Sequence, residues 1–285
     1  MLQLTADKQQ NLKEFTENNY AQGSFFWTQL MKNKDVKVNG ARVGKDVPLN
    51  VGDTVCYYLT AKQETKPAFY TVYEDDNILI VDKESGVNSE AVFAALQREG
   101  EAKGETRCFI HRLDRNTQGL MAFAKTQEME SVLLAAFKQK KVEKIYHALC
   151  FGYFKKSAEV LTAYLKKNPN FAEVKIFDEQ VKGAEKIVTE YKVLGVVGDM
   201  QTKVAVTLHT GKTHQIRAHL AHIGCPIAGD MKYGNALKNK EYRLSRQCLV
   251  AKYLRFELDG KWAYLNDKTF ESRFDVDIEK TEVET

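Results

Sequence analysis

The chain of 285 residues has no apolar run long enough to span a membrane. Runs such as Ile78–Val81 have the length of a strand, whereas a membrane helix needs about 18 consecutive apolar residues. The first ten residues, MLQLTADKQQ, have no basic region followed by an apolar stretch, so we expect neither a secretion signal nor a membrane partner. Prolines number only four, and no repeat or low-complexity segment is present. With 44% apolar and 28% charged residues, this composition excludes a disordered or fibrous protein.

Cysteines are few and scattered. The chain has five, none in a CxxC spacing, at Cys56, Cys108, Cys150, Cys225 and Cys248. An odd, dispersed set is typical of reduced thiols that pack as small apolar side chains. We therefore expect a cytoplasmic protein without disulfides.

Neither sign of charge dominates, because the chain has 42 basic and 38 acidic side chains and a net charge of +4. The distribution is uneven. Residues 270–285 form an acidic C-terminal tail with six acidic and two basic side chains, which leaves 40 bases and 32 acids in residues 1–269. Such an excess fits a polyanion ligand such as RNA, but many soluble proteins share it, so charge alone assigns no function.

The polar segment 61–68, AKQETKPA, predicts a boundary between two domains. We expect a small α+β module over residues 1–62 and a larger domain over residues 68–285. In the module, the pattern predicts a helix over Lys8–Asn19. It also predicts short strands over 36–38 and 51–58, with a tight turn at Asn39–Gly40.

In the larger domain, some segments have apolar residues at the helical spacing and others alternate as in strands. We expect strands over 69–82, 120–124, 145–151, 186–197 and 202–209, and helices over 91–98, 128–140 and 213–223. The strands 186–197 and 202–209 are expected to form a hairpin through Gly198–Asp199, and Gly224 is expected to end the last helix. Hairpin-linked strands with interspersed helices predict an α+β fold with a mostly antiparallel central sheet and flanking helices.

The first motif whose residues could take part in catalysis is CFIHRLDRNTQGLMAFAK, residues 108–125. A polar loop separates two apolar segments, and in it Asp114 stands between Arg112 and Arg115. One interpretation is a surface turn whose ion pairs are worth about 0.5 kcal/mol each. The other is a carboxylate nucleophile that a neighbouring cation keeps ionised. The residues alone leave both open.

The second motif covers residues 208–230 and holds four of the six histidines, at positions 209, 214, 219 and 222. It resembles part of a phosphate loop, but Val206 stands where that loop needs glycine. The histidine spacing provides no pair at i and i+4 beside a glutamate, so we expect no metal site. A helix that opens at Thr213 would instead present Arg217 and backbone N–H groups to an anion.

The third motif is KQKKVEKIYHALCFG, residues 138–152. Its lysines are either a solvated helix end or a patch that contacts phosphates beside Tyr146, whose ring can stack on a base. No Ser–His–Asp or Cys–His arrangement and no glycine-rich dinucleotide motif is present. We therefore expect chemistry without a metal or cofactor.

Taken together, these blocks resemble the RluA-type pseudouridine synthases, which isomerise uridine in RNA. HRLDRNTQGL is similar to the family's HRLDxxTSGL, KIYHALCFG to its K-x-Y-x-A strand, and LHTGKTHQIRAH to its L-x-TGRTHQIR-x-H segment. YEDDNILIVDK is similar to the strand that opens the family's catalytic domain. The blocks follow the family's order from Phe69 to Phe256. Two departures are Gln118 in place of serine and DKESGVNSE, residues 82–90, in place of the family's Lys-Pro-x-Gly-x-x-x-His.

The resemblance implies an RNA pseudouridine synthase in which Asp114 is the catalytic aspartate and Tyr146 the active-site tyrosine. It also implies that Arg217 pairs with Asp114 and that Arg112 enters the RNA stack in place of the flipped base. The remaining RNA-binding candidates are the cations Arg115, Lys138, Lys140, Lys141 and Lys212.

The same resemblance implies an enzyme that acts as a monomer without metal or cofactor. Large-subunit ribosomal RNA is the expected partner, and transfer RNA is the alternative. Through VKVNG and VGDTV, the first module is similar to a small RNA-binding module named after a ribosomal protein, although it lacks the arginine-rich first helix. Two other classes stay open: a non-catalytic RNA-binding protein of the same fold, and a metal-dependent hydrolase that uses the histidines.

Overall fold

The computed structural model describes residues 1–168, 173–197 and 200–276, which form two compact units. The first unit comprises Met1–Arg115 and Met121–Glu130. The second comprises Asn116–Leu120 and the chain from Ser131 onward. The predicted division into domains 1–62 and 68–285 stays a prediction.

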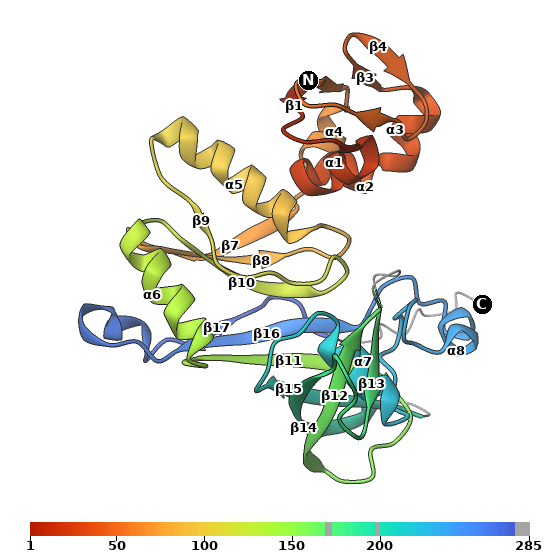
Figure 1. The fold of residues 1–285 in the computed structure, drawn as a ribbon, viewed down its shortest axis with the longest axis vertical. Helices are drawn as coiled ribbons and strands as arrows, with labels where there is room; N and C mark the ends of the chain where they lie inside the picture. Colours follow the sequence, from red (N-terminus) through yellow and green to blue (C-terminus); the bar gives the residue numbers. More distant parts are fainter. Residues whose placement is uncertain (169–172, 198–199, 277–285) are drawn as a thin grey trace, which may run out of the picture. The chain divides into compact units, whose positions relative to one another are not determined.

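The first unit opens with a small sheet and four short helices (Figure 1). In spatial order the sheet contains β1 (Leu2–Thr5), β6 (Thr54–Tyr57), β3 (Val36–Val38) and β4 (Ala41–Val43), while β2 (Gln10–Asn11) pairs with β5 (Pro48–Leu49). The helices are α1 (Leu12–Asn19), α2 (Ala21–Phe25), α3 (Trp27–Asn33) and α4 (Ala61–Glu64). The predicted tight turn at Asn39–Gly40 is confirmed, with φ of 49° at Asn39 and 82° at Gly40, and it leads into β4, a strand that was not predicted.

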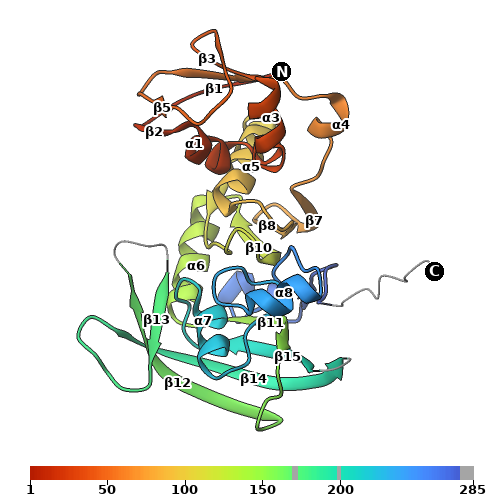
Figure 2. The same ribbon diagram turned by 90° about the vertical axis from the view of Figure 1, so that its right-hand side faces the viewer.

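Helix α1 packs against one face of this sheet (Figure 2). Its Leu12 and Phe15 are buried in the same apolar cluster as Val36, Val55 and Tyr57 of the strands. The helix begins later than the predicted residue 8, because the two residues before it pair with β5. Apolar burial thus decides which part of the stretch becomes helical.

The rest of the first unit is a second group of strands covered by a helix. Its elements are β7 (Phe69–Glu74), β8 (Ile78–Lys83), β9 (Cys108–Phe109), the later part of β10 (Gln118–Ala124), and α5 (Ser89–Lys103). Helix α5 packs through Phe93, whose ring centroid lies 5.2 Å from that of Phe109 and 6.1 Å from that of Phe123. It is longer than predicted because its polar second half shows no apolar period, and it ends at Gly104 with a φ of 70°.

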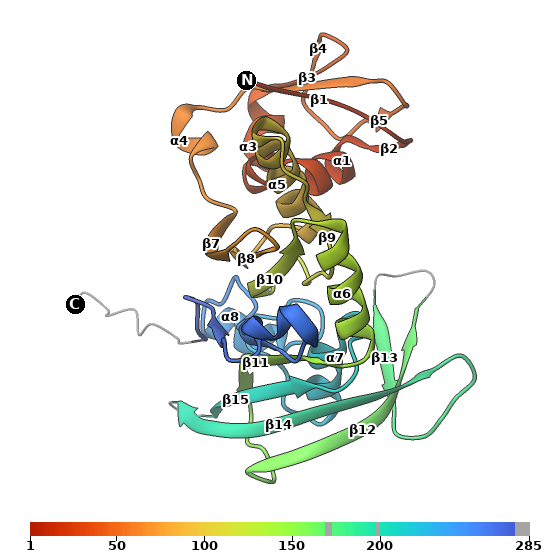
Figure 3. The same ribbon diagram turned by 90° about the vertical axis from the view of Figure 1, so that its left-hand side faces the viewer.

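The second unit contains six long or central strands side by side (Figure 3). In spatial order they are β13 (Val174–Phe177), β12 (Ala158–Lys167), β14 (Glu185–Val197), β15 (Gln201–Leu208), β11 (Val142–Phe151) and β16 (Leu249–Phe256). They pair antiparallel, as does β17 (Phe270–Glu271) with β16, whereas the first residues of β10 pair with β16 in parallel. The prediction of an α+β fold with a mostly antiparallel sheet is confirmed.

The predicted hairpin of residues 186–209 is confirmed, since β14 and β15 pair from Thr189↔Leu208 to Val197↔Gln201. Its expected turn at 198–199 lies outside the described residues. Strand β11 lies between β15 and β16, and its side chains are buried on both faces from Tyr146 to Phe151.

Three helices and one 3₁₀ segment complete the second unit: α6 (Gln127–Lys138, which begins in the first unit), α7 (Gln215–His222), α8 (Ala236–Glu241) and the 3₁₀ segment Gly260–Leu265. Helix α7 begins two residues after the predicted Thr213, because His214 has a left-handed φ of 56°. The predicted end is confirmed, with Gly224 at a φ of 83°. Ala218 of α7 packs with Ile176 and Ile187 of the sheet.

The acidic tail is only partly described. Glu271 lies in β17 and pairs with Lys252, and the Asp275 carboxylate lies 3.0 Å from both His147 Nδ1 and Lys203 Nζ. Residues 277–285, with the tail's other four acidic side chains, lie outside the described residues. All five cysteines are free. In the described part of the chain, no helix is long and apolar enough to cross a membrane.

Candidate active site

Asp114 lies in the loop between β9 and β10, and its neighbours on both sides are fixed within the first unit. The Ser89 hydroxyl accepts from the Leu113 amide and donates to the Leu113 carbonyl, both at 2.9 Å. On the other side, Arg115 donates to the Gly86 carbonyl at 3.1 Å and forms an ion pair with Glu17. These bonds hold the backbone that carries the carboxylate, which is what a preorganised catalytic group requires.

A buried lysine also supports this loop. The Lys83 ammonium, at the end of β8, donates to the carbonyls of Glu84 and Val87 at 2.9 Å and of Arg115 at 3.1 Å. Burial lowers its pKa to about 7, while the negative charge of Asp114 acts to raise it. Lys83 is not among the site residues predicted from the sequence. The sequence feature that could have indicated it is a lysine at the end of YEDDNILIVDK, just after the apolar run ILIV.

The second half of the loop is fixed within the second unit. The buried Gln247 amide donates to the Thr117 hydroxyl at 3.0 Å. Gly119 has a φ of 114°, and a Cβ added there would lie 2.4 Å from the Ala251 carbonyl oxygen. Only glycine permits this conformation and this close approach of β10 to β16.

Tyr146 lies on β11 and is buried. Its register partners are Val206 on β15 and Ala251 on β16. The pairing with β16 shifts between Ile145 and Tyr146. Such a bulge locally redirects side chains and is common next to active sites.

Arg217 lies in α7 and is almost completely buried against Asp230. Its Nε and Nη2 donate to the two carboxylate oxygens at 2.7 and 3.0 Å, a bidentate geometry. Burial acts to raise the pKa of Asp230, but the Arg217 guanidinium and the backbone N–H groups of Tyr233 and Lys232 outweigh burial and lower it. The Asp230 carboxylate therefore fixes the arginine by two charge-assisted hydrogen bonds.

Asp230 and its neighbour Tyr233 are not among the site residues predicted from the sequence. The Arg217 guanidinium lies 5.2 Å from the centroid of the Tyr233 ring, and the Tyr233 hydroxyl lies 3.0 Å from His214 Nδ1. Both residues belong to GDMKYG, residues 229–234, at and just beyond the end of the second motif. The predicted pairing of Arg217 with Asp114 stays a prediction.

Four of the predicted RNA-binding cations have carboxylate partners. The pairs are Arg112–Glu90, Arg115–Glu17, Lys141–Asp259 and Lys212–Glu185. Lys138 and Lys140 are exposed. The Arg112 side chain is 69% exposed although it lies 3.0 Å from Glu90, and such surface pairs are worth only about 0–1 kcal/mol. An RNA phosphate can therefore replace the carboxylate.

The four histidines of the second motif are not gathered at one point. Each lies within hydrogen-bond distance of its own partner: His209 of Glu190, His214 of Tyr233, His219 of Thr189 and His222 of Asp178. Within the ranges that the structure describes, no group of three or more potential ligands is arranged to hold a metal ion. The histidine arrangement therefore gives the hydrolase alternative no support.

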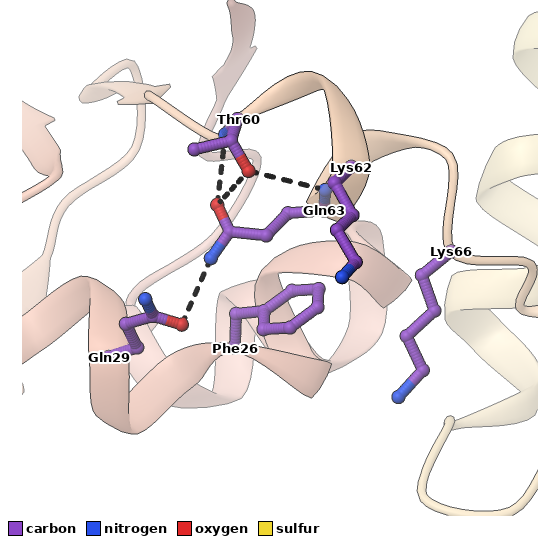
Figure 4. A pocket seen from close by; sticks show the side chains of 6 residues that line it. All are labelled: Phe26, Gln29, Thr60, Lys62, Gln63 and Lys66. Atoms are coloured by element: carbon purple, nitrogen blue, oxygen red, sulfur yellow. Dashed lines mark hydrogen bonds between the residues drawn. The ribbon is translucent and has the colours of Figure 1, made fainter.

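A pocket of about 410 Å³ lies elsewhere in the first unit, beside α4 (Figure 4). Its lining residues are Phe26, Gln29, Thr60, Lys62, Gln63 and Lys66. The Gln63 amide donates to Gln29 and accepts from Thr60, which leaves the polar wall largely satisfied. None of the predicted catalytic residues lines this pocket.

Comparison with known proteins gives a consistent family. The family model described as RNA pseudouridylate synthase matches residues 65–222. Ribosomal large subunit pseudouridine synthase C of Vibrio vulnificus is 32% identical over 251 residues, which cover 80% of this chain and 78% of the relative. An RNA pseudouridine synthase of Aquifex aeolicus is 31% identical over 262 residues, 82% of each chain.

Among solved structures, human RNA pseudouridylate synthase domain containing 1 matches with a TM-score of 0.58 and 28% identity. The match covers 67% of this chain and 79% of the human chain. Sequence and fold therefore agree on the same enzyme class. The chain belongs to the RNA pseudouridylate synthase family.

Proposed function

We propose that this enzyme isomerises specific uridines of large-subunit ribosomal RNA, with Asp114 as its catalytic carboxylate. The main support is the Asp114 loop, which is held by Ser89, Arg115 and Lys83 in the first unit. The ribosomal RNA target is supported by the names of relatives such as that of Vibrio vulnificus.

The reaction breaks the bond between ribose C1′ and uracil N1, turns the base, and joins C1′ to C5. The proton on C5 is released and N1 gains one, so atoms and electrons balance without an oxidant or reductant. Asp114 supplies the anionic group at the reacting nucleoside, and a carboxylate needs no base to activate it.

A uridine within folded RNA must leave the stack to reach such a site, at a cost of a few kcal/mol. The exposed Arg112 side chain offsets part of that cost by entering the vacated space. The Tyr146 ring stacks on the flipped uracil, worth about 1–3 kcal/mol. Lys138 and Lys140 bind phosphates directly, and Arg115, Lys141 and Lys212 do so by exchanging their carboxylate partners.

Pseudouridine mapping of total RNA from cells with and without the protein tests the target. We expect one or more pseudouridines of large-subunit ribosomal RNA to disappear and to return with the wild-type gene but not with Asp114→Asn. Loss confined to transfer RNA would select the alternative target. An unchanged map would contradict the proposed function.

We also infer that the enzyme works in the reducing cytoplasm. The support is that its five cysteines are free, with three of them buried as small apolar side chains.

A further inference from the structure

Basic side chains are frequent in residues 231–246, here called the α8 segment because α8 lies within it. Figure 2 shows the position of α8. The segment contains five basic side chains and one acidic side chain, Glu241. The basic ones are Lys232, Lys238, Lys240, Arg243 and Arg246. None of them was among the predicted RNA-binding residues.

Three of these cations are exposed and free of carboxylates. In the ranges of the chain that are described, Lys240, Arg243 and Arg246 take part in no ion pair. Arg112 and Lys212, in contrast, would have to give up a carboxylate before they bind a phosphate. The three free cations therefore offer the larger net gain on meeting a polyanion.

The α8 segment is attached to the turn that carries Asp230. Asn239 is 3% exposed; its Oδ1 accepts from the Gly229 amide at 2.8 Å and its Nδ2 donates to the Asp230 carbonyl at 3.0 Å. The Asn235 side chain caps α8 by accepting from the Lys238 amide at 3.1 Å. The cations thus stand on an ordered support.

The far end of the segment meets the same turn. A Cβ on Gly229 would lie 1.7 Å from the Arg246 carbonyl oxygen, so the two backbones are in direct contact. Because Asp230 holds Arg217 in a bidentate pair, a short series of buried contacts links the α8 cations to that arginine.

We propose that the α8 segment is a phosphate-binding surface for the substrate RNA, with Lys240, Arg243 and Arg246 as its contacts. RNA is the partner because the surface is fixed to the turn that positions Arg217, an active-site residue under the proposed function on which this inference rests. Phosphate contacts of this kind set the register of the RNA without reading its sequence.

The test compares two triple variants that remove the same charge. K240Q/R243Q/R246Q removes the α8 cations, and K182Q/K186Q/K192Q removes three exposed lysines in and just before β14. Binding of an unmodified transcript of large-subunit ribosomal RNA is measured over a range of salt concentrations, and thermal unfolding verifies that both variants fold.

We expect the β14 variant to bind with nearly the wild-type affinity and salt dependence. For the α8 variant we expect affinity lower by about tenfold or more, and a slope of log K against log salt that is shallower by about 2–3, as for three lost phosphate contacts. Equal behaviour of the two variants, whether both weakened or both unchanged, would overturn the inference. An unchanged α8 variant would assign the surface to another acidic partner, such as a protein.

Tritium release from the same transcript, labelled with [5-³H]uridine, separates this inference from the proposed function. Under single-turnover conditions with saturating RNA, we expect all three proteins to release tritium. Release by wild type without a binding defect in the α8 variant would contradict only the surface. No release by wild type from this transcript would contradict the proposed function.

Discussion

Buried titratable side chains show how this protein uses charge at the scale of single residues. Lys83 is completely buried, and its ammonium is held by three carbonyl groups. Burial lowers its pKa to about 7, even though Asp114 acts in the opposite direction. Burial and the charge of His222 lower the pKa of His219 from 6.5 to about 4, and the Asp178 carboxylate offsets this only in part.

The His219 shift predicts a loss of stability in mild acid. The unfolded chain binds a proton near pH 6.5, whereas the folded protein resists it until about pH 4. Stability from this residue is therefore complete above pH 6.5 and falls as the pH drops to 4, by about 3 kcal/mol in total. His219→Gln, whose amide can still bond to Thr189, is expected to remove this dependence.

Urea unfolding of wild type and His219→Gln at pH 6.5 and 4.5 measures the difference. We expect wild type to lose about 2–3 kcal/mol more than the variant between these values. Asp275, with a pKa of about 2, loses its contribution only below pH 3.8 and does not confuse the comparison. Equal losses in the two proteins would contradict the assignment.

Tyr146 provides a second prediction at this scale. In the proposed mechanism, Tyr146→Phe keeps the ring expected to stack on uracil and removes the hydroxyl expected to assist proton removal. We expect RNA affinity to stay within about twofold while the single-turnover rate falls about 100-fold or more, the usual worth of a positioned acid or base. A filter-binding assay and tritium release measure the two quantities. An unchanged rate would limit Tyr146 to stacking.

At the scale of elements, single residues in or beside short turns fix a long side chain or the approach of two strands. The turn after α7 places Asp230 against Arg217, and Gly119 allows β10 to approach β16. Each arrangement depends on a single residue without an adequate substitute.

Asp230→Ala tests the first arrangement. The substitution removes the bidentate carboxylate from a buried guanidinium, which costs about 3–5 kcal/mol of unfolding free energy. Asp178→Ala is the matched control, because its pair with His222 is exposed and worth at most about 1 kcal/mol. Similar losses in the two variants, measured by urea unfolding, would contradict a structural ion pair at Arg217.

Gly119→Ala tests the second. The added Cβ would meet the Ala251 backbone and would sit at an unfavourable φ, so we expect a loss of about 3 kcal/mol or more and reduced activity. In Gly195→Ala the Cβ meets no atom within 4 Å, and this control is expected to stay within about 1 kcal/mol of wild type. Unfolding curves of both variants decide the point, and an unaffected Gly119→Ala would refute it.

Sequence patterns predicted most elements, because the spacing of apolar residues and the residue types of turns depend only on neighbouring residues. The strands β8, β11 and β14, the hairpin of β14 with β15 and the end of α7 all follow from neighbouring residues. The partner of Arg217 could not be predicted from neighbouring residues, because the buried ion pair between Arg217 and Asp230 depends on tertiary packing. For the same reason Lys83 looked like a strand end, and the late start of α7 depends on the left-handed His214.

At the scale of the whole molecule, the family resemblance indicated a function, whereas composition did not. A net charge of +4 is compatible with many partners. The described ion pairs occupy most of the predicted RNA contacts, and the exposed cations Lys240, Arg243 and Arg246 lie in a segment without a recognisable motif. The reaction, in contrast, follows from the family model and from relatives that match over most of the chain.

The most direct test of the central claim is tritium release from a large-subunit ribosomal RNA transcript labelled with [5-³H]uridine, measured for wild type and Asp114→Asn. The substitution keeps the shape of the side chain and removes its charge. We predict that wild type releases tritium and that Asp114→Asn releases none while it binds the transcript with unchanged affinity. Substantial release by Asp114→Asn would contradict the assignment of Asp114 as the catalytic carboxylate.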